Sequence, residues 1–442
     1  MLALTLLALH DLGALSLWRD EVASVIFSKG SLPELLTIVG RDRDAVGLAN
    51  MATYYLLLHF WLFIGETEAR IRLLSVIFGV ASVVPVYFIA RRLAGWLAGG
   101  LAAGIFVLIP YVIHYSQEAR GYSLAMLVAG SLTWLLLIGV ERRTVWPWAA
   151  YGLIAALGLY VHFFVALIVA AHGLWVLATR SLPPWRSALA ALLPILLAAA
   201  PIPFIIAQFG GGHGWIGGLT VQRVVGSLTA LTGSPFVLLA IGFLATIAVI
   251  ARRTDPLAWL LLAAALTPIA MAIGISVVKP MLVARYLVVS LPALAALTAV
   301  GLVSLRPSLA RYAALAGLAV ALMVVVPGAY SDGRQMDWRA AARWIGRDGL
   351  TSDRMIAPRG HEWIAYYLER FGTSNHGRLT TVRRARSQQP ARLWVILMGG
   401  PQQHPPVASK LAPDYVVAAT RAFGTRLRLV LLLHDDTFPA RD

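Results

Sequence analysis

Long uncharged stretches of apolar residues follow one another through the first 330 positions of the chain. Most hold about 20 residues, the length that an α-helix needs to cross the hydrocarbon core of a bilayer. The stretches lie at 73–90, 93–113, 121–140, 144–179, 187–209, 224–251, 256–278, 286–305 and 312–330. The fourth would measure about 54 Å as one helix, enough for two crossings with a turn near residues 160–162. With the apolar N-terminus, the pattern predicts a polytopic α-helical membrane protein with about 11 transmembrane helices.

The N-terminal stretch is short, because Asp11 interrupts it before Trp18. A secretory signal would carry a basic leading region and a cleavage site, and the sequence shows neither. We therefore expect this stretch to be the outer part of a first helix whose cytoplasmic start precedes the chain.

Arginines in the loops orient these helices. Every second loop carries two of them, at 91–92, 142–143, 180 and 186, 252–253, and 306 and 311. All five loops fall on one side of the membrane, which the positive-inside rule makes cytoplasmic. The long first loop at about 16–70, the loops near 114–120, 209–223 and 279–285, and the tail after 331 are then outside. The sequence thus predicts a multi-pass plasma-membrane protein with an extracytoplasmic C-terminal domain.

Composition narrows the class of protein further. Hydrophobic residues make up 59% of the chain and charged residues 13%, against about 25% charged in soluble proteins, so soluble, disordered and fibrous proteins are excluded. The 37 Lys and Arg against 21 Asp and Glu give a net charge of +16. Many of these cations orient helices, so the excess does not indicate nucleic-acid binding. Without cysteine, disulfides, thiol catalysis and thiolate metal sites are excluded.

The last 112 residues have the composition of a water-soluble domain, with 17 Lys and Arg and 10 Asp and Glu in 331–442. Their pattern predicts helices at 337–347, 361–371 and 414–423, strands at 354–357, 393–398 and 427–433, and loops at 378–392 and 399–406. Such alternation is typical of an α/β domain. We therefore divide the chain into a membrane domain, 1–330, and a small extracytoplasmic α/β domain, 331–442.

Acidic residues gather in the first outer loop, which holds seven of the eleven in 1–330. Asp20 and Glu21 follow Trp18 at the outer end of the first span. One interpretation is an interfacial cap, because Trp favours the membrane boundary and acids favour a helix N-terminus. The other is catalytic: a carboxylate in a partly desolvated cavity is a stronger base, suited to removing a proton from an acceptor hydroxyl.

Outer loops otherwise avoid cations, so the few found there need an explanation. Arg120, Arg223, Lys279 and Arg285 all map to the outer side. Cations placed against the topological bias indicate an anion, and a lipid phosphate held by guanidinium groups is the leading candidate. The alternative is that these side chains only reach lipid headgroups.

Other polar residues of the outer loops are candidates for lining the same substrate cavity: Asp42, Asp44, Tyr55, His59, Glu118, Tyr122 and His162. A metal site built from His114, His162 and His213 matches no known ligand spacing. We therefore expect hydrogen-bonded or interfacial histidines here.

Several short motifs together resemble one family of membrane enzymes. They read Ser-Leu-Trp-Arg-Asp-Glu at 16–21, Tyr-Tyr-Leu-Leu-Leu-His-Phe-Trp at 54–61, Gly-Glu-Thr-Glu at 65–68, Tyr-Ser-Gln-Glu-Ala-Arg-Gly-Tyr-Ser-Leu at 115–124 and Ala-Arg-Tyr-Leu at 284–287. The chain is similar to the polyprenyl-phosphate-sugar-dependent glycosyltransferases of the C superfamily (GT-C), and most of all to protein O-mannosyltransferases and lipid A aminoarabinose transferases. The resemblance extends over residues 1 to about 330, and its specific part is the first 125.

The resemblance implies roles for individual residues. Asp20 matches the catalytic acid of the first loop, with Glu21 as its partner, and Arg120 and Arg285 match positions associated with carrier binding; Lys279 is added on topology alone. Relatives in this branch generally need no metal, so no cofactor is expected. Many relatives carry a His/Pro-rich stretch where this chain has residues 43–50, so contacts there do not carry over.

The resemblance also implies an inverting transfer of sugar from a polyprenyl-phosphate carrier to an acceptor hydroxyl at the outer face of the membrane. Mannose is the favoured donor sugar, with arabinofuranose second, and a cell-envelope glycan or glycolipid is the favoured acceptor. Two other classes stay open. A lipid or lipid-linked sugar flippase would use the same cavity, although the halves show no internal repeat, and a non-catalytic scaffold would bind an envelope partner through the outer domain.

Overall fold

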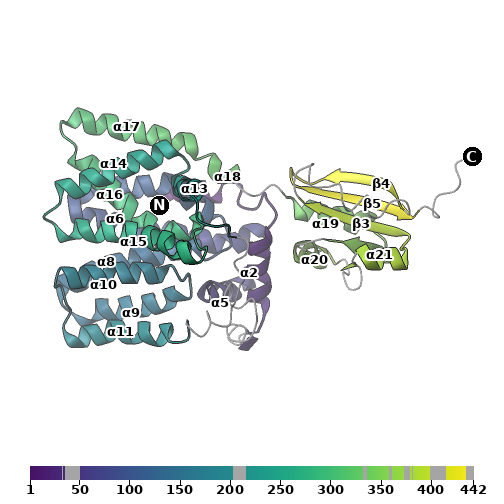
Figure 1. Ribbon diagram of the computed structural model, residues 1–442, viewed down its shortest axis with the longest axis horizontal. Helices are drawn as coiled ribbons and strands as arrows, with labels where there is room; N and C mark the ends of the chain where they lie inside the picture. The colour runs from purple at the N-terminus through teal and green to yellow at the C-terminus, as the bar shows by residue number, and fades with distance from the viewer. Residues whose placement is uncertain are drawn as a thin grey trace, which may run out of the picture. The chain divides into compact units, whose positions relative to one another are not determined.

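The structure is a computed structural model of the chain (Figure 1). It describes residues 1–31, 33–34, 50–202, 216–331, 336–357, 361–372, 379–380, 382–398 and 415–434. Two compact units make up the chain. The first contains Met1–Leu12 and Ser24–Ser331, and the second contains Gly13–Ala23 and Asp332–Asp442. The short segment Gly13–Ala23 therefore packs with the C-terminal residues, although it follows the first helix in sequence.

The first unit is helical. Its elements are α1 (Leu2–Leu9), α5 (Ala52–Trp61), η1 (Leu62–Ile64), α6 (Glu68–Leu108), α7 (Pro110–Ser116), α8 (Tyr122–Arg142), α9 (Val145–Leu159), α10 (Val165–Ala178), α11 (Trp185–Ala199), α13 (Val221–Thr232), α14 (Pro235–Ala251), α15 (Pro256–Val278), η2 (Ala284–Ser290), α16 (Leu291–Ser304), α17 (Ser308–Val325) and α18 (Gly328–Ser331). Helix α2 (Arg19–Lys29) contributes its second half. In the described part of the chain, five helices have the length and composition to cross a membrane, or six if a bent pair is one span.

The longest helix, α6, is two segments joined by a sharp reversal. Ala94 and Gly95 leave helical geometry, and Gly95 has φ 82°. A Cβ atom on Gly99 would lie 2.9 Å from the backbone oxygen of Tyr87. Residues twelve positions apart in a straight helix would be separated by about 18 Å, so the chain must fold back here. The two segments lie over the stretches 73–90 and 93–113 that the sequence predicts as separate crossings.

The predicted crossing at 224–251 is not one straight helix. Helices α13 and α14 meet at an angle of 80°. Gly233 closes α13 in the left-handed region with φ 79°, Ser234 caps α14 through its side chain, and Pro235 occupies the first turn of α14. This Gly-Ser-Pro sequence ends one helix and starts another, because proline fits the first turn of a helix but not its interior. The prediction of an unbroken span was wrong at this point.

Helix α16 lies at the centre of the first unit, where it packs against α6, α14 and α15. Small residues allow the backbones to approach closely. At Gly301 there is no room for a Cβ atom beside the backbone of Leu244, and Gly130 of α8 lies against Pro85 of α6. Close packing of this kind fixes the helix ends, on which the polar side chains described below are carried.

The second unit contains a five-stranded sheet with the order β2-β1-β3-β5-β4. Its strands are β1 (Arg354–Ile356), β2 (Leu379–Thr380), β3 (Arg392–Met398), β4 (Tyr415–Ala422) and β5 (Leu427–His434). Strand β1 is parallel to β2 and β3, whereas β5 is antiparallel to β3 and β4. Figure 1 labels β3, β5 and β4 in this sheet. The helices are α19 (Trp338–Asp348), α20 (His361–Arg370) and α21 (Val382–Gln388).

Helices cover both faces of this sheet. Ala385 of α21 belongs to the same core cluster as Leu393 and Val395 of β3. The intervening Trp394 lies 4.9 Å from Trp344 of α19, ring centroid to ring centroid. Alternate side chains of a strand point to opposite faces, so α21 and α19 pack on different sides. The unit is a small three-layer α/β structure; its predicted position outside the cytoplasm stays a prediction.

Two sequence predictions in this unit were wrong. The segment predicted as a helix at 414–423 contains β4, which pairs with β5 from Tyr415 opposite His434 to Ala422 opposite Arg428. Its Tyr-Val-Val sequence favours a strand, and the neighbouring strand outweighs the helical preference of its alanines. The segment predicted as a loop at 378–392 contains β2 and α21, because its arginines, alanine and glutamine form a helix readily.

Candidate functional site

The predicted catalytic acids lie in the first turn of α2. Trp18 donates its backbone N–H to Oε2 of Glu21, 3.2 Å away, and Glu21 is 1% exposed. A glutamate that reaches back to the residue before its helix satisfies a free N–H of the first turn. Glu21 therefore shapes the start of the helix, whereas Asp20 is half-buried.

The residues just before Asp20 are held by the C-terminal part of the chain, within the second unit. Ser16 Oγ donates to the backbone oxygen of Met336 (3.0 Å) and accepts from the backbone N–H of Trp338 (3.1 Å). The backbone N–H of Leu17 donates to Oη of Tyr367 over 2.7 Å. Residues 16–18 have no regular secondary structure of their own, so these bonds determine the path of the backbone.

Arg120 belongs to the first unit, in the turn between α7 and α8. Its Nη1 donates to Oη of Tyr55 (2.8 Å) and to Oγ of Ser24 (3.4 Å). Its backbone oxygen accepts from Oγ of Ser75 on α6 over 3.4 Å. The guanidinium group is therefore oriented by side chains from α2 and α5, and its backbone is fixed against α6. Sequence reasoning predicted Tyr55 here but missed Ser24, whose position four residues after Asp20 in the same helix was the available signal.

The two predicted carrier-binding arginines, Arg120 and Arg285, both affect the buried side chain of His162. Burial, together with the positive charges of Arg120 and Arg285, lowers the pKa of His162 to about 3. Both cations therefore act on one buried imidazole, which stays neutral at physiological pH. The rings of Tyr122 and Tyr286 lie 5.7 and 4.9 Å from the imidazole, centroid to centroid.

Only one of the two nitrogens of this neutral imidazole has a hydrogen-bond partner among the described residues. The backbone N–H of Phe164 donates to Nδ1 over 3.2 Å, so Nε2 carries the proton. Nε2 of His162 is buried and has no hydrogen-bond partner among the described residues. A buried donor without a partner is costly unless something else accepts its proton. Beside two guanidinium groups, this N–H is suited to an anionic oxygen.

The turn that precedes Arg120 is also held by hydrogen bonds to the end of α1. Nε2 of Gln117 donates to backbone oxygens at the end of α1, including that of His10 over 2.6 Å. Glu118 is buried, and its Oε2 lies 3.4 Å from Nε2 of His114. His114 in turn contacts the backbone oxygen of Ala329 through Nδ1 (3.1 Å). The predicted cavity residue Glu118 thus pairs with a histidine.

Other predicted site residues are not brought into this group. Lys279 ends α15 and is exposed, and in the described part of the chain no contact joins it to Arg120 or Arg285. His59 is half-buried and contacts the backbone oxygen of Ser28 through Nδ1, 2.8 Å away. Asp42, Asp44 and His213 lie outside the described residues. Within those residues, no three His, Asp or Glu side chains group in a way that would hold a metal ion.

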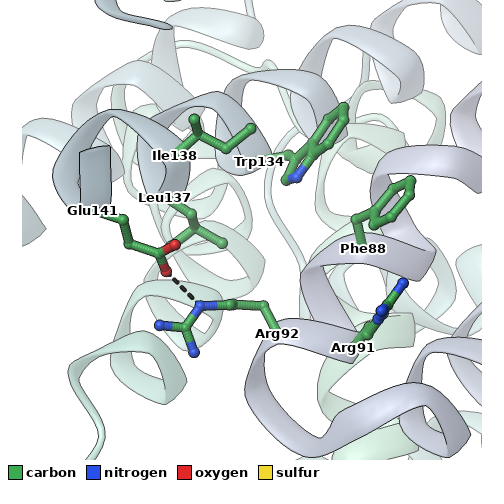
Figure 2. A pocket seen from close by; sticks show the side chains of 7 residues that line it. All are labelled: Phe88, Arg91, Arg92, Trp134, Leu137, Ile138 and Glu141. Atoms are coloured by element: carbon green, nitrogen blue, oxygen red, sulfur yellow. Dashed lines mark hydrogen bonds and ion pairs between the residues drawn. The ribbon is translucent and has the colours of Figure 1, made fainter. Parts of the chain in front are cut away.

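A cavity of about 530 Å³ lies elsewhere in the first unit, at the other end of α8 (Figure 2). It is lined by Phe88, Arg91, Arg92, Trp134, Leu137, Ile138 and Glu141. Arg92 forms an ion pair with Glu141, and the rings of Phe88 and Trp134 stack at 5.0 Å. With α8 about 30 Å long, this cavity is remote from Arg120. Its arginines suit the negative ends of two helices, so we do not include it in the site.

Two kinds of comparison with known proteins bear on the family and the fold of this chain. Residues 49–206 match the profile of the family described as dolichyl-phosphate-mannose-protein mannosyltransferase. The fold is similar to ArnT from Cupriavidus metallidurans bound to undecaprenyl phosphate, with a TM-score of 0.64 and 16% identity over 97% of this chain and 96% of that one. The apo state of the same ArnT gives a TM-score of 0.65 and 15% identity over 96% of each chain. Among curated protein sequences, none matches.

These findings confirm the resemblance to the GT-C glycosyltransferases that the sequence motifs predict. The family profile covers the motifs at 54–61, 65–68 and 115–124, and the ArnT fold extends over nearly the whole chain, including the tail after 331. At this level of identity the structural likeness establishes the fold.

Proposed function

We propose that this chain is an inverting glycosyltransferase that moves a sugar from a polyprenyl-phosphate carrier to an acceptor hydroxyl at the outer face of the membrane. The observation that carries the proposal is that the charges of Arg120 and Arg285 both act on the buried His162 and lower its pKa, while its Nε2 has no hydrogen-bond partner among the described residues. Two cations and an N–H donor are the groups that a phosphate monoester recognises. The proposal is supported by the undecaprenyl phosphate bound to ArnT and by the lipid-phosphate sugar in the description of the family.

In the reaction, the acceptor oxygen forms a bond to the anomeric carbon while the bond from that carbon to the carrier phosphate oxygen breaks. The proton of the acceptor hydroxyl passes to Asp20. Negative charge grows on the departing phosphate, so fixed cations at Arg120 and Arg285 lower the barrier more than they stabilise the bound donor. One displacement inverts the anomeric centre and requires one base, with no sugar–enzyme bond.

The roles of the neighbouring residues follow from their contacts. Tyr55 and Ser24 orient the guanidinium group of Arg120, and Glu21 fixes the first turn in which Asp20 lies. Glu118 and Tyr122 are proposed to shape the carrier pocket around Arg120. Mannose is the proposed donor sugar, with arabinofuranose as the second choice, and a cell-envelope glycan or glycolipid is the proposed acceptor.

Replacing the proposed base tests the function directly. In membranes supplied with a radiolabelled polyprenyl-phosphate sugar, Asp20→Asn is expected to lower the rate of transfer by about 10²–10⁴-fold, the usual contribution of a general base. Asp11→Asn is the matched control, since Asp11 is an exposed acid nearby in sequence, and it should keep normal activity. Full activity of Asp20→Asn would overturn the proposal, and movement of intact donor across the membrane without transfer would identify a flippase.

A further inference from the structure

The residues around Asp20 pack with the C-terminal part of the chain, which is distant from them in sequence. Gly13–Ala23 forms one compact unit with Asp332–Asp442, and the hydrogen bonds that join them connect residues more than 300 positions apart. From these bonds we propose that Tyr367 and Arg339 are positioning residues that hold the backbone leading into Asp20. The inference rests on the proposed function, because it assigns the C-terminal α/β unit a task in that same reaction.

Of these bonds, the one made by Tyr367 lies nearest in sequence to Asp20. Its hydroxyl accepts the backbone N–H of Leu17 over 2.7 Å, and its side chain is fully buried in α20. Leu17 is itself fully buried, so water cannot replace the lost acceptor. Leu17 stands three residues before Asp20, and α2 begins two residues after it. The bond therefore fixes the direction in which the backbone enters the helix.

Arg339 holds the same segment a few residues earlier. Its Nη1 and Nη2 donate to the backbone oxygens of Gly13 (3.2 Å) and Ala14 (2.6 Å). A planar guanidinium group that binds two successive carbonyls restrains both position and orientation. With the two side-chain bonds of Ser16 and the bond of the Leu17 N–H, the segment is held at residues 13, 14, 16 and 17 before the helix starts.

A restraint of this kind matters for catalysis more than for binding of the carrier. A general base must lie within hydrogen-bond reach of the proton that it removes, and an error of about 1 Å in its position costs up to 10²-fold in rate. Arg120, a proposed carrier ligand, has contacts of its own within the first unit: its Nη1 donates to Ser24 and Tyr55, and its backbone oxygen accepts from Ser75. Loosening residues 13–18 should therefore lower kcat and leave the KM for the carrier unchanged.

The first test compares two tyrosines of the same unit. Tyr367→Phe removes the acceptor of Leu17, and Tyr415→Phe removes a hydroxyl that donates to the backbone oxygen of Pro390 over 3.1 Å. In the full-length protein, Tyr367→Phe should lower kcat about tenfold with an unchanged carrier KM, while Tyr415→Phe stays within about twofold of the original. Equal effects of the two changes would overturn the inference.

The second test separates positioning from general loss of structure. If Tyr367 acts through Asp20, then adding Tyr367→Phe to Asp20→Asn should not lower the residual rate further, because effects on one catalytic unit are not additive. A further tenfold loss in the double variant would show that Tyr367 acts otherwise, and would contradict the proposal. Trypsin cleavage after Arg19 gives an independent readout: it should be faster in Tyr367→Phe and Arg339→Gln than in Tyr415→Phe, and equal rates would count against the restraint.

These results also distinguish the inference from the function on which it rests. If Asp20→Asn is fully active, the proposed glycosyl transfer with Asp20 as base fails, whatever Tyr367 does. If Asp20→Asn loses activity and Tyr367→Phe behaves as Tyr415→Phe does, the function stands and the positioning role is refuted.

Discussion

Asp353 of the second unit and His162 of the first are both almost completely buried, but their hydrogen-bonding surroundings differ. Asp353 of the second unit is 1% exposed and accepts three hydrogen bonds, from Nε of Arg392 (3.0 Å), Nε1 of Trp394 (2.7 Å) and the backbone of Leu350 (2.9 Å). His162 of the first unit is 2% exposed and lies near two cations. Among the described residues it has a partner for Nδ1 and none for Nε2.

The difference separates a structural group from a group available to a ligand. The charge of Asp353 is matched by Arg392, and its oxygens are supplied with donors, so it joins the start of β1 to β3 and needs nothing further. His162 is neutral, and its Nε2–H has no partner among the described residues. The positive charges of Arg120 and Arg285 act on the same ring. Buried polar groups in folded proteins usually have partners, so the unmatched one marks the better candidate for function. Three experiments test this contrast.

The largest effect is expected from removing the satisfied charge. Asp353→Asn leaves Arg392 without its carboxylate and should destabilise the protein by about 3 kcal/mol, as the loss of one partner of a buried ion pair does. Thermal unfolding of the full-length protein in detergent, followed by tryptophan fluorescence, would measure the change. Asp348→Asn is the control, because Asp348 pairs with Arg347 at the surface, such pairs contribute little, and the amide oxygen of Asn can still accept the hydrogen bond from Nε1 of Trp344. Equal unfolding temperatures for the two variants would contradict the structural role.

A slightly smaller effect, on activity alone, is expected at the cations beside His162. Arg120→Gln and Arg285→Gln should each lower the rate of sugar transfer about 100-fold and raise the KM for the carrier, because a phosphate loses a charged partner. Arg253→Gln provides the comparison, since Arg253 is exposed in a loop predicted to be cytoplasmic. If the Arg253 variant lost as much activity as the other two, the assignment of the carrier phosphate to Arg120 and Arg285 would fail.

The smallest effect is a dependence of stability on pH. An unfolded histidine binds a proton below about pH 6.5, whereas burial and the charges of Arg120 and Arg285 lower the pKa of His162 to about 3 in the folded protein. As pH falls from 6.5 towards 3, the unfolded state gains a proton that the folded state does not, so stability falls by up to about 1.4 kcal/mol per pH unit. His162→Asn should flatten the fall in unfolding temperature between pH 6.5 and 4.5. An identical slope in both proteins would mean that His162 is already protonated or solvated in the folded state.

Local patterns in the sequence predicted much of the first unit. Runs of apolar residues marked the helices. Arg120 and Arg285 stood out because they depart from the positive-inside pattern; their charges both lower the pKa of His162, and their role in carrier binding stays a prediction. The same reasoning placed Lys279 with them, although it is exposed at the end of α15. A topological argument specifies a side of the membrane and cannot specify which way a side chain points.

Contacts between distant residues were beyond sequence reasoning. The motif at 16–21 identified Asp20, but nothing in it indicated that Ser16 and Leu17 bind residues 320 and 350 positions away. Strand β4 was missed for a related reason, because its conformation depends on pairing with β5 and its own composition is ambiguous. The break at Gly233 to Pro235 carried a local signal, a glycine and proline around a capping serine, that outweighs apolar periodicity.

The separation of Gly13–Ala23 from its partners has a consequence for how the polypeptide matures. Ser16 leaves the ribosome 320 residues before Met336 does, a delay on the order of tens of seconds at about 5–20 residues per second. Until then, residues 13–23 of the nascent chain lack their final contacts with the C-terminal residues. A truncated form that stops near Ser331 would lack Met336, Arg339 and Tyr367, so the bonds that hold the backbone before Asp20 could not form in it.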